Sequence, residues 1–176
     1  MLTLGGDHGI ASGSIHGLQK TYGENLKVIW VDAHGDATHP DDYQHYHGMP
    51  TGHLLGWLAK GEVKAFDWFT PMLKKENLVY IGLRDLDKIE KATLIDNNIK
   101  IFTPYDIELK GGIGNVMNES LDYLKCDNHH ENPVMISWDI DACDPSFIQG
   151  TGTKARCGLS ERESHFILKR TFNTGN

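Results

Sequence analysis

Residues 28–36 read Val-Ile-Trp-Val-Asp-Ala-His-Gly-Asp, and this stretch decides the fold. Its first four residues are apolar, which is typical of a parallel strand that is covered on both faces. Its polar residues follow directly, at the carboxyl end of that strand. In an open α/β sheet, residues just past the carboxyl ends of parallel strands converge on one crevice. The stretch therefore predicts an α/β fold with polar groups gathered at one edge of the sheet.

The rest of the chain alternates strand-like and helix-like segments. Strands are expected at Met1–Leu4, Lys27–Val31, Leu78–Leu83, Lys100–Thr103 and Pro133–Trp138. Helices are expected at Ile10–Tyr22, Thr51–Lys60, Lys88–Asn97, Ile113–Lys125 and Ser160–Phe172, the last with a capping box formed by Ser160 and Glu163. This alternation predicts βαβ units that build a single three-layer α/β/α sandwich with a mainly parallel sheet over residues 1–176.

Metal-ligating residue types follow three of these expected strands. The candidate ligands are His8, Asp32, His34, Asp36, Asp139 and Asp141. In an extended segment the side chains at positions 32, 34 and 36 would project to the same side. Four carboxylates in one crevice repel one another unless cations hold them together. Six ligands suit two ions that share bridging carboxylates, so we expect a two-metal hydrolase.

The choice of ligands also indicates which metal and which substrate charge to expect. Oxygen-rich coordination with two imidazoles and no thiolate favours Mn²⁺ over Mg²⁺ and Zn²⁺. Four aspartates, two divalent cations and one hydroxide sum to about −1. A cationic group such as a guanidinium would neutralise that charge, whereas a phosphate would add to it.

The overall composition excludes several classes of protein. A net charge of −7 argues against a nucleic-acid surface. The three cysteines form no C-x-x-C pair, which predicts a reducing compartment rather than a disulfide framework. No apolar run is long enough to span a membrane, and no signal-peptide pattern opens the chain. We therefore expect a cytoplasmic protein. His53 and His165 lie in predicted helices and are expected to have surface or capping roles.

The motifs resemble those of a known family. Gly-Gly-Asp-His at 5–8, Asp-Ala-His-Gly-Asp at 32–36 and Ser-Trp-Asp-Ile-Asp-Ala-Cys-Asp-Pro at 137–145 resemble the metal-binding signatures of the ureohydrolases, and most nearly those of arginases. His-Gly-Met-Pro at 47–50, the stretch 80–87 and Thr-Gly-Thr at 151–153 follow in family order. The resemblance covers nearly the whole chain and implies the arginase-like α/β fold.

The resemblance also implies a set of ligands and a reaction. One Mn²⁺ would be held by His8, Asp32, Asp36 and Asp139, and the other by Asp32, His34, Asp139 and Asp141. A hydroxide bridging the two ions would attack the guanidinium carbon of L-arginine, which would yield L-ornithine and urea. Asp36 would pass a proton to the departing amine, and His47 would shuttle protons from the loop 37–50.

The same resemblance assigns substrate contacts. Asp87 matches the carboxylate that recognises the α-amino group, and Thr153 matches a residue near the guanidinium. The family's Asn and Ser contacts to the substrate carboxylate are altered in this chain, where Thr38, Tyr43 and His45 could still donate hydrogen bonds to it. A homo-oligomer, a trimer by resemblance, is expected, with neither nucleic acid nor membrane as a partner.

The chain departs from the family pattern in three respects. It opens at an expected core strand, and family members are considerably longer. It stops at Asn176, before the segment with the glutamate that pairs with the guanidinium, so a fragment with an incomplete sheet is expected. The loop before His47 is altered, and Gly9 stands where a serine commonly follows Gly-Gly-Asp-His.

Two alternatives to an arginase stay open. The altered loop leaves room for another ureohydrolase that acts on agmatine or a guanidino acid. The expected absence of the guanidinium-binding glutamate leaves room for an inactive, metal-binding homologue that serves as a regulatory subunit. Retention of all six candidate ligands together with His47 favours the enzyme.

Overall fold

A parallel four-stranded sheet forms the centre of the computed structural model, which describes residues 2–40, 45–126 and 132–175. The strands are β1 (Lys27–Val31), β2 (Leu78–Ile81), β3 (Lys100–Phe102) and β4 (Val134–Trp138). They lie in the order β3-β2-β1-β4, and every pairing is parallel. The predicted strands at these four places are confirmed, with ends that differ by no more than two residues.

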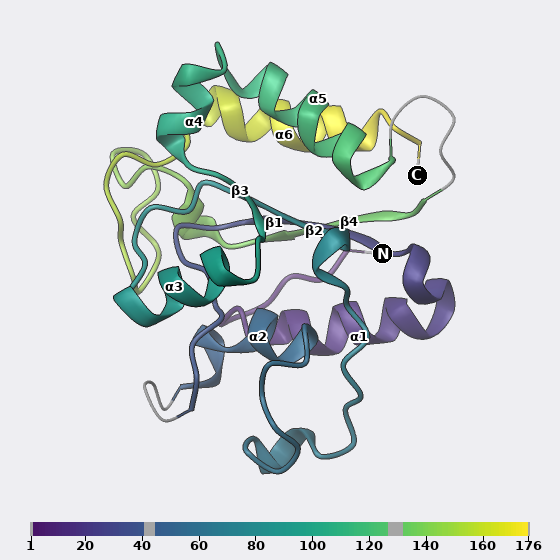
Figure 1. Ribbon diagram of the computed structural model, residues 1–176. Coiled ribbons are helices and arrows are strands. Elements are labelled where there is room, and N and C mark those ends of the chain that lie inside the picture. Colours follow the sequence, from purple (N-terminus) through teal and green to yellow (C-terminus); the bar gives the residue numbers. More distant parts are fainter. Residues whose placement is uncertain (1, 41–44, 127–131, 176) are drawn as a thin grey trace.

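Helices cover both faces of the sheet (Figure 1). On one face lie α1 (Ile10–Tyr22), α2 (Pro50–Leu54) and α3 (Lys88–Asp96), and on the other α4 (Pro104–Leu109), α5 (Ile113–Leu124) and α6 (Glu161–Phe172). Two apolar cores result, because the side chains of β1 alternate between the faces. Val28 and Trp30 pack in the core that includes Ile15 of α1, whereas Ile29 and Val31 pack with Met117 of α5. The expected three-layer α/β/α sandwich is confirmed.

Local capping explains where two helices begin. Ser160 and Glu163 form the predicted capping box at the start of α6, with a 2.8 Å bond from the Ser160 N–H to the glutamate side chain. Helix α4 was not predicted. It begins after Thr103, whose side chain forms a second capping box with Asp106.

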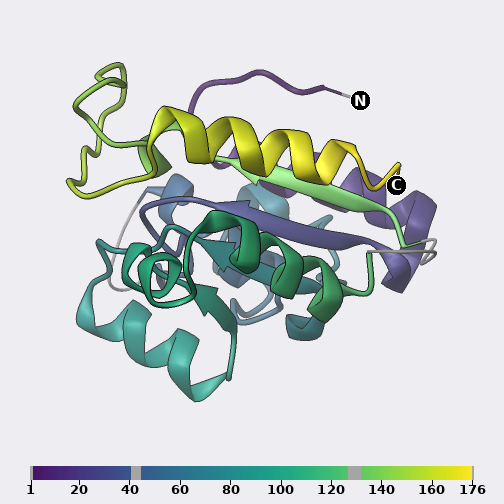
Figure 2. The same ribbon diagram turned by 90° about the horizontal axis from the view of Figure 1, so that it is seen from above.

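Two predicted elements are wrong. Residues 2–4 form no strand: Leu2 and Leu4 are 82% and 86% exposed, and the segment runs apart from the sheet (Figure 2). No described strand pairs with its backbone, so the segment lacks the partner that a strand requires. Met1 lies outside the described residues. The helix expected at 51–60 ends at Leu54, because Gly56 adopts a left-handed φ of 76° that an α-helix does not continue through.

The edge of the sheet at the carboxyl ends of the strands is the edge that carries the polar clusters. Asp32 follows β1 directly, and Asp139 follows β4 directly. Within the described ranges, no helix has the length and apolar content that crossing a membrane requires.

Candidate metal centre

The register of two neighbouring strands brings the aspartate clusters together. Val31 at the end of β1 is the direct partner of Trp138 at the end of β4. Asp32 and Asp139 therefore begin side by side. His8 approaches them from the turn that precedes α1. The carboxyl-end rule accounts for the meeting of Asp32 and Asp139, whereas His8 arrives from a turn that no described strand precedes.

The local conformation of the clusters differs from the extended one that the sequence suggested. The chain bends at residues 33–34, and the His34 N–H donates a 2.8 Å bond to Oδ1 of Asp32. Asp36 has a φ of 50°, in the left-handed region. After β4, the Asp139 side chain caps a 3-10 turn and accepts a 2.9 Å bond from the N–H of Asp141. The side chains thus converge through tight turns and not through strand alternation.

Buried hydrogen bonds hold the turn at Gly35 in place. The hydroxyls of Thr51 and Tyr80 each donate a 2.7 Å bond to the Gly35 carbonyl. The buried Glu90 accepts a 3.0 Å bond from the N–H of Ala37. A Cβ on Gly35 would lie 2.8 Å from the Glu90 carboxylate, so a larger residue there would displace the side chain that bonds to Ala37. This packing fixes the backbone that carries Asp36.

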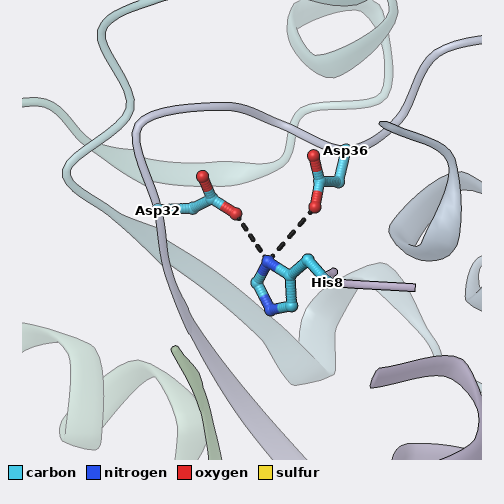
Figure 3. Close-up of side chains that lie close together, drawn as sticks. All are labelled: His8, Asp32 and Asp36. Atoms are coloured by element: carbon cyan, nitrogen blue, oxygen red, sulfur yellow. Dashed lines mark hydrogen bonds and ion pairs between the residues drawn. The ribbon is translucent and has the colours of Figure 1, made fainter. Parts of the chain in front are cut away.

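His8 faces three carboxylates (Figure 3 shows the two from the β1 turn). Its Nδ1 lies 2.8 Å from Asp32 Oδ2, 3.2 Å from Asp36 Oδ2 and 3.4 Å from Asp139 Oδ2. Its other ring nitrogen is 2.9 Å from the hydroxyl of Ser137, and the ring stacks on Trp30 at 4.0 Å. The imidazole is therefore fixed from both sides.

His34 gathers a second group that shares Asp32. Its Nδ1 lies 3.2 Å from Asp141 Oδ2 and 3.6 Å from Asp32 Oδ1. The hydroxyl of Thr153 donates a 2.8 Å bond to the same oxygen of Asp141. One oxygen of Asp32 thus faces each group, and the ligand atoms within each group lie within 4.8 Å of one another. Asp139 contacts His8 and therefore belongs to the first group.

The carboxylates and imidazoles shift one another's pKa values. Burial lowers the pKa of His8, but contacts with Asp32 and Asp36 outweigh it and raise the value to about 10. Burial also lowers the pKa of His34, but contacts with Asp141 and Asp32 outweigh it and raise the value to about 11. Burial and the charge of Asp32 raise the pKa of Asp36, and they raise that of Asp139 to about 6. The carboxylates of this cluster therefore stabilise positive charge placed among them.

The donor set fits divalent cations. It combines four carboxylates with two imidazoles and contains no thiolate, which suits Mn²⁺. Oδ2 of Asp36 is buried and has no hydrogen-bond partner among the described atoms, although it lies 3.2 Å from His8 Nδ1. A buried carboxylate oxygen without a hydrogen bond is costly unless a positive charge offsets it. The residues therefore fit the metal that the sequence pattern implies.

An open cavity of ≈1580 Å³ extends from this cluster. Of the other predicted site residues, Thr38, His47, Asp87 and Thr153 line it. His45 does not line it, but its ring stacks beside that of His47 with centroids 5.9 Å apart. The Thr38 hydroxyl donates a hydrogen bond to the carbonyl of Gly48. Part of the loop before His47, residues 41–44, lies outside the described residues.

Several residues that support the cluster were not predicted. Ser137 bonds to His8, and Trp30 donates a 2.9 Å bond to Oδ2 of Asp32. Both lie in apolar strands. The polar side chain of Ser137 inside such a strand was the one feature of the sequence that could have indicated a role near the site. His53 was expected at a surface or a cap, but it is 7% exposed and packs among aromatic rings. Its burial follows from the loop that covers α2, which local patterns do not reveal.

Comparison with known proteins places the chain among related sequences. The family model described as "Arginase family" matches residues 1–176. The arginase of Plasmodium berghei is 45% identical over 99% of this chain, and that of Staphylococcus aureus strain COL is 46% identical over 96%. The 1.7 Å crystal structure of an arginase from Bacillus subtilis superposes on 97% of the chain with a TM-score of 0.85 at 37% identity.

The matches cover only part of the other proteins. The chain spans about half the length of the curated relatives it matches, namely 49% of the Plasmodium protein and 54% of the Staphylococcus protein. It covers 57% of the Bacillus structure.

Proposed function

Because this chain belongs to the arginase family, we propose that it supplies the active centre of a manganese-dependent hydrolase that converts L-arginine to L-ornithine and urea. The observation that carries the proposal is the pair of ligand groups that share Asp32. In this proposal His8, Asp32, Asp36 and Asp139 hold one ion, and Asp32, His34, Asp139 and Asp141 hold the other. Two bound Mn²⁺ ions would supply Lewis acidity that makes water nucleophilic near neutral pH.

The residues of the chain have distinct tasks in the reaction. Hydrolysis joins a water oxygen to the guanidinium carbon and breaks the bond from that carbon to the amine nitrogen, which must gain a proton. Asp36 suits the transfer, because it lies beside the cluster and because burial and the charge of Asp32 raise the pKa of its carboxyl group. His47 lines the cavity and would exchange that proton with solvent.

The remaining contacts would orient the substrate. Thr153, which bonds to Asp141, lies beside the metal groups, where the guanidinium would bind. Asp87 lines the same cavity and carries the negative charge that an α-amino group requires. Thr38 and His45 are the proposed contacts for the α-carboxylate, which would require the Thr38 hydroxyl to leave the Gly48 carbonyl and His45 to turn toward the cavity. The net charge of −7 favours a cationic substrate over an anionic one.

The first experiment measures urea release. The purified 176-residue chain is loaded with Mn²⁺ and given L-arginine, and an Asp139→Ala variant serves as the control. We expect urea from the wild type and none from the variant. Comparing turnover of arginine, agmatine and 4-guanidinobutyrate then identifies the substrate. A folded, metal-loaded chain that releases urea from none of them would contradict the proposal and favour a metal-binding regulatory relative.

Assembly and cellular location are predictions that need their own measurements. A homotrimer, proposed from the resemblance, would sediment at three times the mass of one chain. A cytoplasmic location is proposed from the cysteine pattern, which suits a reducing compartment, and is tested by fractionating cells that express the protein.

A further inference from the structure

Tyr46 lies beside His47 in the short 3-10 turn Tyr46–Gly48. We propose that Tyr46 is a positioning residue that holds this turn, and with it His47, against the helix that follows His8. The inference rests on the proposed function, in which His47 moves protons. A 3-10 turn of three residues has weak hydrogen bonds of its own, so its position depends on anchors elsewhere.

The hydroxyl of Tyr46 reaches two different helices. It lies 2.6 Å from the Ser12 hydroxyl at the start of α1 and 2.8 Å from Nδ1 of His53 in α2. Ser12 is fully buried and His53 nearly so. Burial and the nearby His16 lower the pKa of His53, which keeps its imidazole neutral and able to accept. In the tautomer with its proton on Nε2, His53 accepts from Tyr46, and Ser12 then donates to Tyr46.

The ring of Tyr46 is held as firmly as its hydroxyl. It stacks on Phe66 with centroids 4.3 Å apart and an interplanar angle of 17°. On another side it packs against Gly9, where an added Cβ would lie 3.0 Å from the ring. A side chain at position 9 would therefore crowd this ring as well as the Asp7 carboxylate, whose Oδ1 would lie 2.7 Å from the new Cβ. Gly9 directly follows His8, so this contact joins the turn of His47 to the turn of a candidate ligand.

Gly9 and Tyr46 lie at two of the places where the resemblance led us to expect a departure from the family pattern. The structure brings these departures into direct contact. A glycine at 9 leaves the space that the tyrosine at 46 fills. Gly9 and Tyr46 are therefore complementary in size. Through Tyr46, the loop before His47 is fixed to α1 and α2. Displacing His47 by even about 1 Å would slow a proton transfer substantially.

The first test removes the hydroxyl and keeps the ring. Tyr46→Phe and Ser12→Ala are compared with wild type, and Tyr105→Phe, at an exposed tyrosine, is the matched control. We expect kcat for urea release to fall on the order of tenfold in the first two variants, with KM changed less than about twofold. The control is expected to match wild type.

A second readout does not depend on activity. In metal-free protein labelled with ¹³C-histidine, the ring signal of His47, assigned with a His47→Gln variant, reports its surroundings. We expect this signal to shift or broaden in Tyr46→Phe and to stay unchanged in Tyr105→Phe. If wild type releases no urea, the proposed function fails while this spectrum still decides the positioning role.

The pairing with Gly9 is tested separately. Gly9→Ala is made alone and together with Tyr46→Leu, which removes the facing ring. We expect the alanine to perturb the His47 signal strongly when Tyr46 is present, and to add little when Tyr46→Leu is the background. An equal perturbation in both backgrounds would assign the clash to Asp7, whose Oδ1 would lie 2.7 Å from the new Cβ, and would contradict the pairing.

One outcome overturns the positioning role altogether. If Tyr46→Phe lowers the melting temperature but leaves kcat and the His47 signal unchanged, Tyr46 only packs the loop. If Tyr46→Phe changes none of the melting temperature, kcat and the His47 signal, the positioning role is overturned as well.

Discussion

Nδ1 of His8 lies 2.8 Å from Oδ2 of Asp32, although 24 positions separate the two residues in the sequence. The other oxygen of Asp32 lies 3.6 Å from Nδ1 of His34. Asp32 therefore connects both ligand groups, and it is 1% exposed. A carboxylate in this place shares its charge between the buried His8 and the partly exposed His34.

This relationship predicts that Asp32 controls both proposed metal sites. Asp32→Asn keeps the size of the side chain but removes its charge, so both groups lose an anionic ligand. We expect Mn²⁺ affinity to fall at least about 100-fold and the number of bound ions to drop below two per chain. Isothermal calorimetry measures both quantities. Asp96→Asn, at an exposed position, is the control, and an unchanged stoichiometry in Asp32→Asn would contradict the shared-ligand arrangement.

Metal binding is also expected to release protons. The pKa values of His8 and His34, about 10 and about 11, lie well above neutral pH, so both imidazoles carry a proton when no metal is bound. A metal ligand must be a neutral imidazole, so each proton leaves as an ion binds. Affinity for Mn²⁺ should therefore rise between pH 6 and pH 8. Calorimetry at one pH in two buffers of different ionisation enthalpy counts the protons, and equal apparent enthalpies would contradict this prediction.

The architecture was largely predictable from the sequence because local signals and tertiary contacts agreed there. The apolar run of β1 marks a strand buried on both faces, and Ser160 with Glu163 marks the start of α6. The start of α4 carried the same kind of signal in Thr103 and Asp106 but was not recognised. The strand expected before Gly5 failed because strand formation requires a partner, and a single segment does not specify one.

The candidate site was predictable in its membership but not in its geometry. The rule for carboxyl ends gathers Asp32 and Asp139, whatever the local conformation. The left-handed turn at Asp36 depends on Thr51, Tyr80 and Glu90, which come from distant segments. Contacts of this kind leave no periodic pattern in the sequence.

Glu90 is expected to make stability depend on pH. Burial, with the charge of Asp87, raises its pKa from 4.5 to about 7. The folded state therefore holds this proton more tightly than the unfolded state. The contribution of Glu90 to stability is thus fully present below pH 4.5 and is lost as pH rises through about 7. Glu90→Gln should remove about 2–3 kcal/mol of this pH dependence.

Urea denaturation of metal-free protein at pH 5 and pH 8 tests the role of Glu90. The difference in unfolding free energy between the two pH values is compared for wild type, Glu90→Gln and the exposed control Glu161→Gln. A Glu90→Gln variant with the same pH difference as wild type would show that another group is responsible.

Arg84 is expected to be important for stability. Its guanidinium donates to backbone carbonyls of residues 82, 141, 142, 143, 155 and 156. These bonds tie the segment after β4 to the segment that carries Thr153. Arg84→Met should lower the unfolding free energy by about 3 kcal/mol, because several carbonyls lose a charged donor. Arg84→Lys should recover little, since an ammonium does not span the same carbonyls.

Urea denaturation measures the effect of Arg84. Arg156→Met is the matched control, because its side chain is exposed while its carbonyl remains available to Arg84. Equal stability of Arg84→Met and Arg156→Met would contradict the structural role.

Asp87 combines a visible structural task with a proposed binding task, and one substitution separates them. Its Oδ1 accepts 2.8 Å bonds from the N–H groups of Ile89 and Glu90 at the start of α3. Asparagine caps a helix as well as aspartate does, so Asp87→Asn should leave stability within about 0.5 kcal/mol, whereas Asp87→Ala should cost about 1 kcal/mol.

The binding task depends on the charge that Asp87→Asn removes. If Asp87 recognises an amino group, KM should rise about tenfold for arginine and agmatine, which carry one at this end, and not for 4-guanidinobutyrate, which lacks it. Steady-state kinetics with the three substrates measures the difference, and chemical denaturation of the same preparations checks the cap. An equal rise for all three substrates would mean that the substitution acts through the loop, and no rise for any would leave Asp87 as a helix cap alone.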